Sequence, residues 1–109
     1  MAQSDPWKQV PRARRIVVKI GTSSLTDELG VIDERVIESL CEQLVRVRSL
    51  GHEVVVVSSG AVSAGVAALG LPARPTDTPT LQALSAAGQS RLMEVYNRHL
   101  GSRGVVAAQ

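Results

Sequence analysis

The sequence predicts an α/β fold in which helices cover a mainly parallel sheet, arranged as a three-layer α-β-α sandwich. Short runs of β-branched residues alternate along the chain with longer segments that repeat at helical spacing. The strand-like runs are almost unbroken in apolar character, which is typical of parallel strands buried on both faces. The order strand, helix, strand, helix, helix, strand favours parallel pairing through right-handed crossovers.

The first half of the chain predicts one strand and one helix. The strand covers residues 16–20 and ends at Gly21, and a loop rich in Gly, Thr, Ser and Asp extends to residue 32. Asp33 is the expected N-cap of the helix, and Gly51 is expected to end it because glycine readily adopts the left-handed conformation. The apolar stripe of this helix comprises Val36, Ile37, Leu40, Cys41, Leu44 and Val45.

The second half of the chain repeats the pattern. Residues 53–58 contain four consecutive valines and predict a second strand. A helix of small residues is expected over residues 61–69, with Ser58 or Ser59 as its N-cap. A long helix is expected over residues 80–100, and residues 105–108 begin a third strand. The inward face of the long helix comprises Leu81, Leu84, Gly88, Leu92, Val95 and Tyr96.

The chain is expected to form an arm followed by part of one domain. Residues 1–13 contain two prolines and no periodicity, which predicts a flexible, extended N-terminal arm. Residues 14–109 are the N-terminal portion of a domain that we expect to be incomplete, truncated within its third strand. Residues 1–20 hold five Lys and Arg against one Asp. Nucleic-acid binding by this basic arm is an alternative, but the chain has only one Trp and one Tyr to stack on bases.

Composition excludes several classes of protein. Of the 109 residues, 44% are hydrophobic and 20% are charged, values typical of globular domains. No apolar stretch approaches the roughly 20 residues that cross a bilayer, and residues 1–10 lack the apolar segment of a secretion signal. We therefore expect a cytoplasmic protein with no membrane partner. The single Cys41 excludes a disulfide framework, and the histidines lack metal-ligand spacing, so no protein-held metal is expected.

Two strand ends carry residues suited to binding anions. The first is residues 19–23, Lys-Ile-Gly-Thr-Ser. A lysine near the end of a buried strand needs an anionic partner, because an unpaired buried charge is costly. The glycine lets backbone N–H groups approach that anion, and the hydroxyls add donors. The residue order differs from a Walker motif. The alternative is a lysine that reaches solvent from an edge strand.

The second strand end is residues 58–61, Ser-Ser-Gly-Ala, which precede a predicted helix. A helix N-terminus carries unpaired N–H groups and a partial positive charge, which favour a carboxylate or phosphate. The alternative is that a serine only caps the helix. If the two strands are neighbours, both turns lie at the carboxyl edge of the sheet, where open α/β sheets bind ligands. Two such turns could hold two anions close together, as phosphoryl transfer requires.

Three segments of the chain resemble the amino acid kinase family. They are residues 17–23 (Val-Val-Lys-Ile-Gly-Thr-Ser), 57–65 (Val-Ser-Ser-Gly-Ala-Val-Ser-Ala-Gly) and 86–93 (Ala-Ala-Gly-Gln-Ser-Arg-Leu-Met). They stand in one collinear register across residues 14–109. Thr22 after Gly21 is similar to the glutamate 5-kinase branch, because aspartokinases and acetylglutamate kinases tend to carry a second glycine there.

The resemblance implies transfer of the γ-phosphoryl group of ATP to the side-chain carboxylate of L-glutamate, the first step of proline biosynthesis. It implies that ATP is bound by Lys19, Gly21, Thr22 and Ser23, and that Lys19 is catalytic. It implies that glutamate is bound by Ser59, Gly60 and Ala61. Mg²⁺ would arrive with ATP on its phosphate oxygens. Homo-oligomers are also expected from the family.

The resemblance also implies that more chain is needed for activity. The family's kinase domain is more than twice as long as this chain, and many members carry a C-terminal PUA domain. We therefore expect the 109 residues alone to be inactive. Two alternatives remain: a family member that acts on a different carboxylate or on carbamate, and a non-catalytic domain that reuses the fold.

Overall fold

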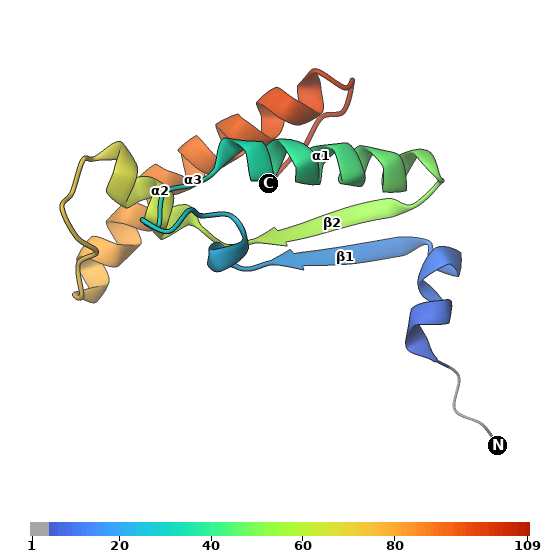
Figure 1. Cartoon of the computed structure of the whole chain (residues 1–109), viewed down its shortest axis with the longest axis horizontal. Coiled ribbons are helices and arrows are strands. Elements are labelled where there is room, and N and C mark those ends of the chain that lie inside the picture. The colour runs from blue at the N-terminus through green and yellow to red at the C-terminus, as the bar shows by residue number, and fades with distance from the viewer. Residues whose placement is uncertain (1–4) are drawn as a thin grey trace.

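The computed structural model describes residues 5–109 and confirms the first two of the three strands and all three helices that the sequence predicts (Figure 1). Strand β1 spans Arg15–Ile20 and strand β2 spans Glu53–Ser58. Helix α1 spans Glu34–Ser49, α2 spans Ala61–Ala68 and α3 spans Thr78–Gly101. Asp33 caps α1 by accepting a hydrogen bond from the Arg35 N–H at 3.0 Å, and Gly51 follows the helix with φ +98°.

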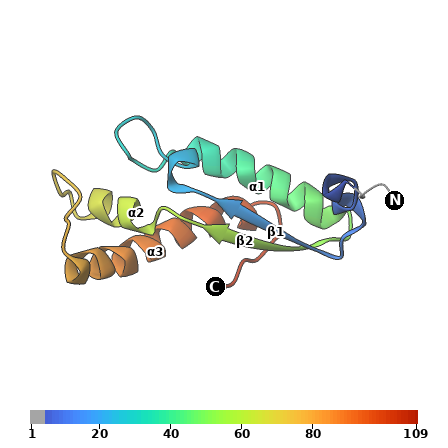
Figure 2. The same cartoon turned by 90° about the horizontal axis from the view of Figure 1, so that it is seen from below.

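The two strands form a parallel sheet that helices cover on one face (Figure 2). The register pairs Arg15 with Glu53 and Ile20 with Ser58, so the strands begin and end together. Residues that alternate along each strand are half-buried beneath the helices, whereas those of the opposite face are exposed, including Val17 at 61%. The α/β class and the parallel pairing are confirmed. Residues 5–109 provide two of the three expected layers.

The core lies between the sheet and helices α1 and α3. Its fully buried members follow one narrow line on each helix, such as Ile37 and Cys41 on α1 and Leu92 on α3. Val36, at the margin of the α1 stripe, is 37% exposed. Leu25, in the loop before α1, is 0% exposed although no periodicity singled it out. The core therefore includes a loop residue that the helical pattern alone does not predict.

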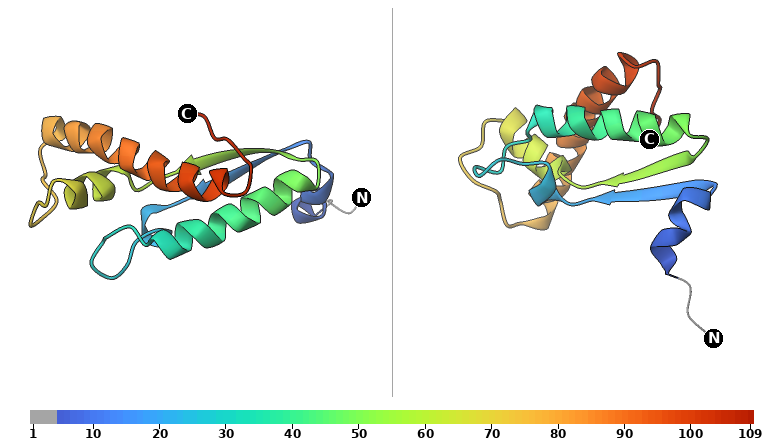
Figure 3. Two further views of the ribbon diagram at one scale, coloured as in Figure 1. Left: turned by 90° about the horizontal axis from the view of Figure 1, so that it is seen from above. Right: turned by 45° about the vertical axis from the view of Figure 1, so that its right-hand side comes forward.

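Helices α2 and α3 cross very closely beyond the carboxyl ends of the strands (Figure 3). A Cβ at Gly88 would lie 1.7 Å from the Ala61 carbonyl oxygen, and one at Gly65 would lie 2.1 Å from the Leu84 carbonyl oxygen. Each glycine thus lets the backbone of one helix contact the other directly. The first half of α3 supports α2, and its second half packs against α1.

Two expectations about the backbone conformation of the chain ends are wrong. Residues 5–13 are not extended but form two 3-10 helices, Pro6–Lys8 and Val10–Arg12, because each begins with a proline in its first turn. The part of the expected arm in residues 1–4 lies outside the described residues. Residues 105–108 do not form a third strand. Val105 and Ala107 pack against the core and Val106 is 91% exposed, so the alternation of a strand is present, but no ladder forms with β2.

No helix within residues 5–109 combines the length and apolar character required to cross a bilayer.

Candidate functional site

The two turns that the sequence predicts to bind anions lie side by side at the carboxyl edge of the sheet. The Ser59 N–H donates to the Ile20 carbonyl at 2.9 Å, which joins the second turn to the end of β1. The hydroxyls of Thr22 and Ser59 are hydrogen-bonded at 2.5 Å. The condition that β1 and β2 are neighbours is thus met, and the structure brings two of the predicted site residues into direct contact.

Lys19 and Gly21 lie where β1 runs into its turn. Lys19 is exposed on the sheet face that the helices leave uncovered, and within residues 5–109 its ammonium group has no hydrogen bond or ion pair. Gly21 has φ −80° and ψ 160°, an extended conformation open to any residue. A Cβ there would meet nothing within 4 Å. The Lys19 ammonium group and the space beside the Gly21 Cα are therefore not used by the described residues, which leaves both available to a ligand.

Thr22 and Ser23 begin the 3-10 helix η3, Thr22–Ser24. The first hydrogen bonds of this helix are donated by the N–H groups of Ser24 and Leu25, so the N–H groups of Thr22 and Ser23 find no acceptor among residues 5–109. Thr22 also accepts a hydrogen bond from the Thr26 hydroxyl on its carbonyl, at 3.0 Å. The Thr26 hydroxyl thus stabilises the turn through the Thr22 carbonyl, while the N–H groups of Thr22 and Ser23 stay available to a ligand.

The second turn differs from the capping arrangement that the sequence predicts. The N-cap of α2 is Gly60 and no side chain caps the helix, so the expectation that Ser58 or Ser59 does so is wrong. Gly60 has φ +106°, a left-handed conformation that glycine adopts without strain. The Ser59 side chain, which precedes Gly60, does not cap the helix because its hydroxyl is hydrogen-bonded to Thr22.

The start of α2 therefore has unpaired backbone donors. Its first helical hydrogen bond runs from the Ala64 N–H to the Gly60 carbonyl at 2.9 Å. The N–H groups of Ala61, Val62 and Ser63 have no acceptor among the described residues. Together with the dipole of the helix, these donors favour an anion such as a carboxylate. Gly88 on α3 packs against the Ala61 carbonyl and so holds this first turn in place.

Sequence reasoning missed one polar contact beside these turns. Ser58 faces the helices, and its hydroxyl is hydrogen-bonded to that of Tyr96 on α3 at 2.8 Å. Burial raises the pKa of Tyr96 above its ordinary value. The available signal was that a buried tyrosine hydroxyl requires a polar partner, and a serine at the end of a neighbouring strand is within reach.

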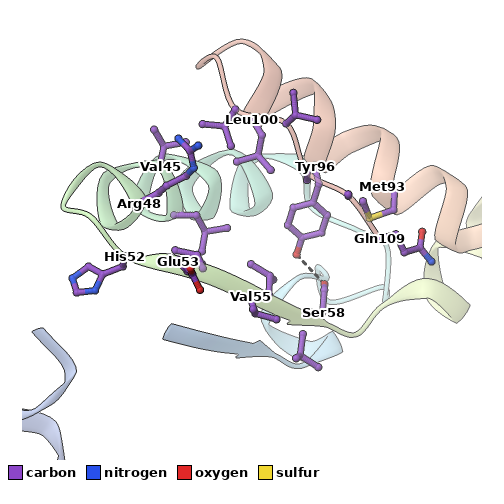
Figure 4. Close-up of a pocket in the computed structure, with 18 of the residues that line it drawn as sticks. Val45, Arg48, His52, Glu53, Val55, Ser58, Met93, Tyr96, Leu100 and Gln109 are labelled. Atoms are coloured by element: carbon purple, nitrogen blue, oxygen red, sulfur yellow. Dashed lines mark hydrogen bonds between the residues drawn. The ribbon is translucent and has the colours of Figure 1, made fainter. Parts of the chain in front are cut away.

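A groove of about 920 Å³ runs along the outer edge of β2 and reaches Ser58 at its carboxyl end (Figure 4). Its walls come mainly from apolar residues of β2, α1, α3 and residues 105–109. Lys19, Thr22 and Ser59 do not line it. The groove lies along the edge of β2 that has no partner strand among the described residues. Residues 5–109 contain no cluster of three or more His, Cys, Asp or Glu suited to holding a metal ion.

Comparisons with known proteins identify the family to which this chain is similar. A model of the amino acid kinase family matches residues 14–109. The chain is 47% identical over 100 residues to a glutamate 5-kinase of Rhodopirellula baltica, covering 92% of this chain and 26% of that protein. It is 45% identical over 98 residues to a glutamate 5-kinase of Halalkalibacterium halodurans, covering 90% and 26%.

A glutamate 5-kinase of Listeria welshimeri is 44% identical over 102 residues, covering 94% of this chain and 37% of that protein. The chain thus spans between a quarter and two fifths of the length of these curated relatives. The match extends over β1, β2 and α3, which carry the three segments singled out in the sequence. Because the family model matches residues 14–109, the chain belongs to the amino acid kinase family.

Proposed function

We propose that this chain contributes the acceptor-binding part of a kinase that transfers the γ-phosphoryl group of ATP to the side-chain carboxylate of L-glutamate. The observation that carries the proposal is the hydrogen bond between Thr22 and Ser59, which joins two donor-rich turns at one edge of the sheet. The names of the relatives support glutamate as the acceptor. The product is an acyl phosphate, L-glutamyl 5-phosphate.

In this proposal the first turn binds the transferred phosphoryl group. The N–H groups of Thr22 and Ser23 donate to its oxygens, and the absence of a side chain at Gly21 lets phosphate approach the backbone. The Lys19 ammonium group offsets negative charge that develops as the phosphoryl group moves. The open space at Gly21 and the unpartnered ammonium group of Lys19 support these roles.

The second turn binds glutamate. The Ser59 hydroxyl and the backbone of Gly60 and Ala61, at the uncapped start of α2, donate hydrogen bonds to a carboxylate of the acceptor. A carboxylate oxygen of glutamate then attacks the γ-phosphorus, and the bond to the β-phosphate bridging oxygen breaks to release ADP. No covalent bond to the protein is needed. Positioning of two mutually repelling anions, together with electrostatic stabilisation, supplies the rate acceleration.

Mg²⁺ is proposed to accompany ATP on its phosphate oxygens, where it would neutralise charge. We also propose a cytoplasmic location and a homo-oligomeric assembly, in line with the family.

The experiment measures ATP-dependent formation of glutamyl hydroxamate in the full-length polypeptide whose reading frame carries residues 1–109. Lys19→Ala is expected to lower turnover by about 10²–10³-fold, while its unfolding midpoint stays unchanged because Lys19 has no partner within residues 5–109. Lys8→Ala, which removes an exposed lysine from the first 3-10 helix, is the matched control and keeps full turnover.

Three outcomes would reject the proposal or part of it. Phosphorylation of another acid but not of glutamate would reject the acceptor and favour a different family member. Unchanged turnover in Lys19→Ala would reject the assigned role of the lysine. Salt-sensitive retention of DNA or RNA that disappears when residues 1–13 are deleted, in a protein without kinase activity, would favour the nucleic-acid alternative.

A further inference from the structure

A chain of three hydrogen-bonding groups connects α3 to the turn after β2. The Ser58 hydroxyl donates to the Ser59 carbonyl at 3.0 Å and is also bonded to the Tyr96 hydroxyl at 2.8 Å (Figure 4). A serine hydroxyl carries a single proton. Because Ser58 uses its proton on the Ser59 carbonyl, Tyr96 must be the donor in the second bond. The direction is therefore Tyr96 to Ser58 to the backbone of Ser59.

The last acceptor in this chain belongs to the peptide unit shared by Ser59 and Gly60. That unit is planar, so fixing the direction of the Ser59 carbonyl also fixes the direction of the Gly60 N–H. Gly60 has φ +106°, a conformation that glycine adopts freely but does not by itself enforce, so a hydrogen bond to the adjoining carbonyl adds a restraint to the turn. The hydrogen-bonded chain supplies such a restraint in addition to the contact between Ser59 and Thr22.

Tyr96 is well suited to act as the fixed end of this chain. It is 5% exposed and belongs to the core cluster that also contains Leu25, Ile37 and Cys41. A tyrosine hydroxyl keeps its proton at neutral pH and so remains a donor, and burial raises the pKa of Tyr96 further. Its ring packing does not depend on the hydroxyl, so Tyr96→Phe removes one hydrogen bond and leaves the core filled.

We infer that Tyr96 is a positioning residue for acceptor binding, which acts through Ser58 to hold the Ser59–Gly60 peptide in its binding orientation. This inference rests on the proposed function, since it assigns Ser59 and Gly60 to the acceptor. It separates the two adjacent serines: Ser59 contacts the acceptor, whereas Ser58 faces the core and only orients the backbone.

The test compares variants of the full-length polypeptide. Tyr96→Phe and Ser58→Ala are each expected to raise the KM for glutamate roughly three- to ten-fold, the loss typical of one neutral hydrogen bond. The KM for ATP and the turnover at saturating glutamate should change by less than about two-fold. The double variant should be no worse than either single variant, because both break the same chain. Ser58→Thr, which keeps the hydroxyl, should retain the parent KM.

Ser49→Ala is the matched control. The Ser49 hydroxyl also donates to a backbone carbonyl, that of Arg46 at 2.6 Å, but it lies at the end of α1, near the start of β2. Its removal should leave the KM for glutamate unchanged. If Tyr96→Phe fails to fold, Ser58→Ala gives the same test without disturbing the aromatic core.

Hydrogen exchange decides the inference independently of activity. In the ligand-free protein, the amides of Ser59 and Ala64 should exchange faster in Tyr96→Phe than in the parent or in Ser49→Ala. If the parent phosphorylates glutamate but Tyr96→Phe keeps its KM, the inference is overturned while the proposed function stands. If the parent does not phosphorylate glutamate, the proposed function fails. Faster exchange then still supports the restraint, and unchanged exchange overturns it.

Discussion

Gly88→Ala should destabilise the protein although it improves the helical propensity of α3. A Cβ at this position would lie 1.7 Å from the Ala61 carbonyl oxygen and 2.5 Å from the Gly65 nitrogen, whereas such contacts essentially never fall below 3.0 Å. The two helices would have to separate by about 1.3 Å, with both close atoms belonging to backbone that cannot rotate away. Overpacking of this kind costs about 1–3 kcal/mol or more. The gain from replacing glycine in a helix is at most about 1 kcal/mol.

The assay is urea unfolding of the full-length polypeptide, with Gly101→Ala as the control. Gly101 is also in α3, but a Cβ there would meet nothing within 4 Å, so its replacement should be neutral or slightly stabilising. Gly88→Ala should unfold at a clearly lower urea concentration than this control. It should also raise the KM for glutamate, because Ala61 moves with its carbonyl. Equal midpoints for the two variants would refute the close crossing of α2 and α3.

Two further predictions separate folding from function. Gly21→Ala should leave the unfolding midpoint unchanged or raise it slightly, because φ −80° suits alanine and nothing lies within 4 Å of its Cβ. Turnover should nevertheless fall at least roughly ten-fold. Unchanged turnover would reject phosphate binding at this turn. Glu34→Gln tests the link between α1 and α3: hydrogen bonds from His99 and Arg98 hold the pKa of Glu34 below its ordinary value. A lowered carboxylate pKa stabilises the fold above the ordinary pKa, so the stability advantage of the parent over Glu34→Gln should be present at pH 7 and shrink as the pH falls below about 4.3. An advantage that is constant from pH 7 to pH 3 in urea unfolding would contradict the assignment.

The elements could be predicted because their signals are local. Periodic apolar residues, the Asp33 cap and four consecutive valines define α1 and β2 within a few neighbours along the chain. The prediction of a third strand was wrong because a strand requires a hydrogen-bonded partner strand. Residues 105–108 alternate between half-buried and exposed side chains, but they form no hydrogen-bonded ladder with β2. The prediction of an extended N-terminal segment was wrong because a proline can lie in the first turn of a 3-10 helix, although it prevents a longer helix.

The candidate site was predicted only as two separate turns, because side-chain contacts across it join residues 37 or more apart, such as Thr22 with Ser59 and Ser58 with Tyr96. Spacing along a sequence does not say which of two adjacent serines faces the core. That choice follows from the parallel register, which places Ser58 opposite Ile20 on the helix-covered face and carries the chain past the edge at Ser59.

Three of the four glycines in the family-like segments, Gly21, Gly60 and Gly88, illustrate why identical residues need a structure to be distinguished. Gly60 has a left-handed φ, and a Cβ there would also lie 3.2 Å from Ile32. Gly88 is required by the contact between two helices, whereas Gly21 is required by neither conformation nor packing within residues 5–109. A loss of turnover in Gly21→Ala could therefore not be attributed to a packing contact of the described residues. Gly21 is therefore the position of the three at which loss of function without loss of stability is the strongest evidence for binding.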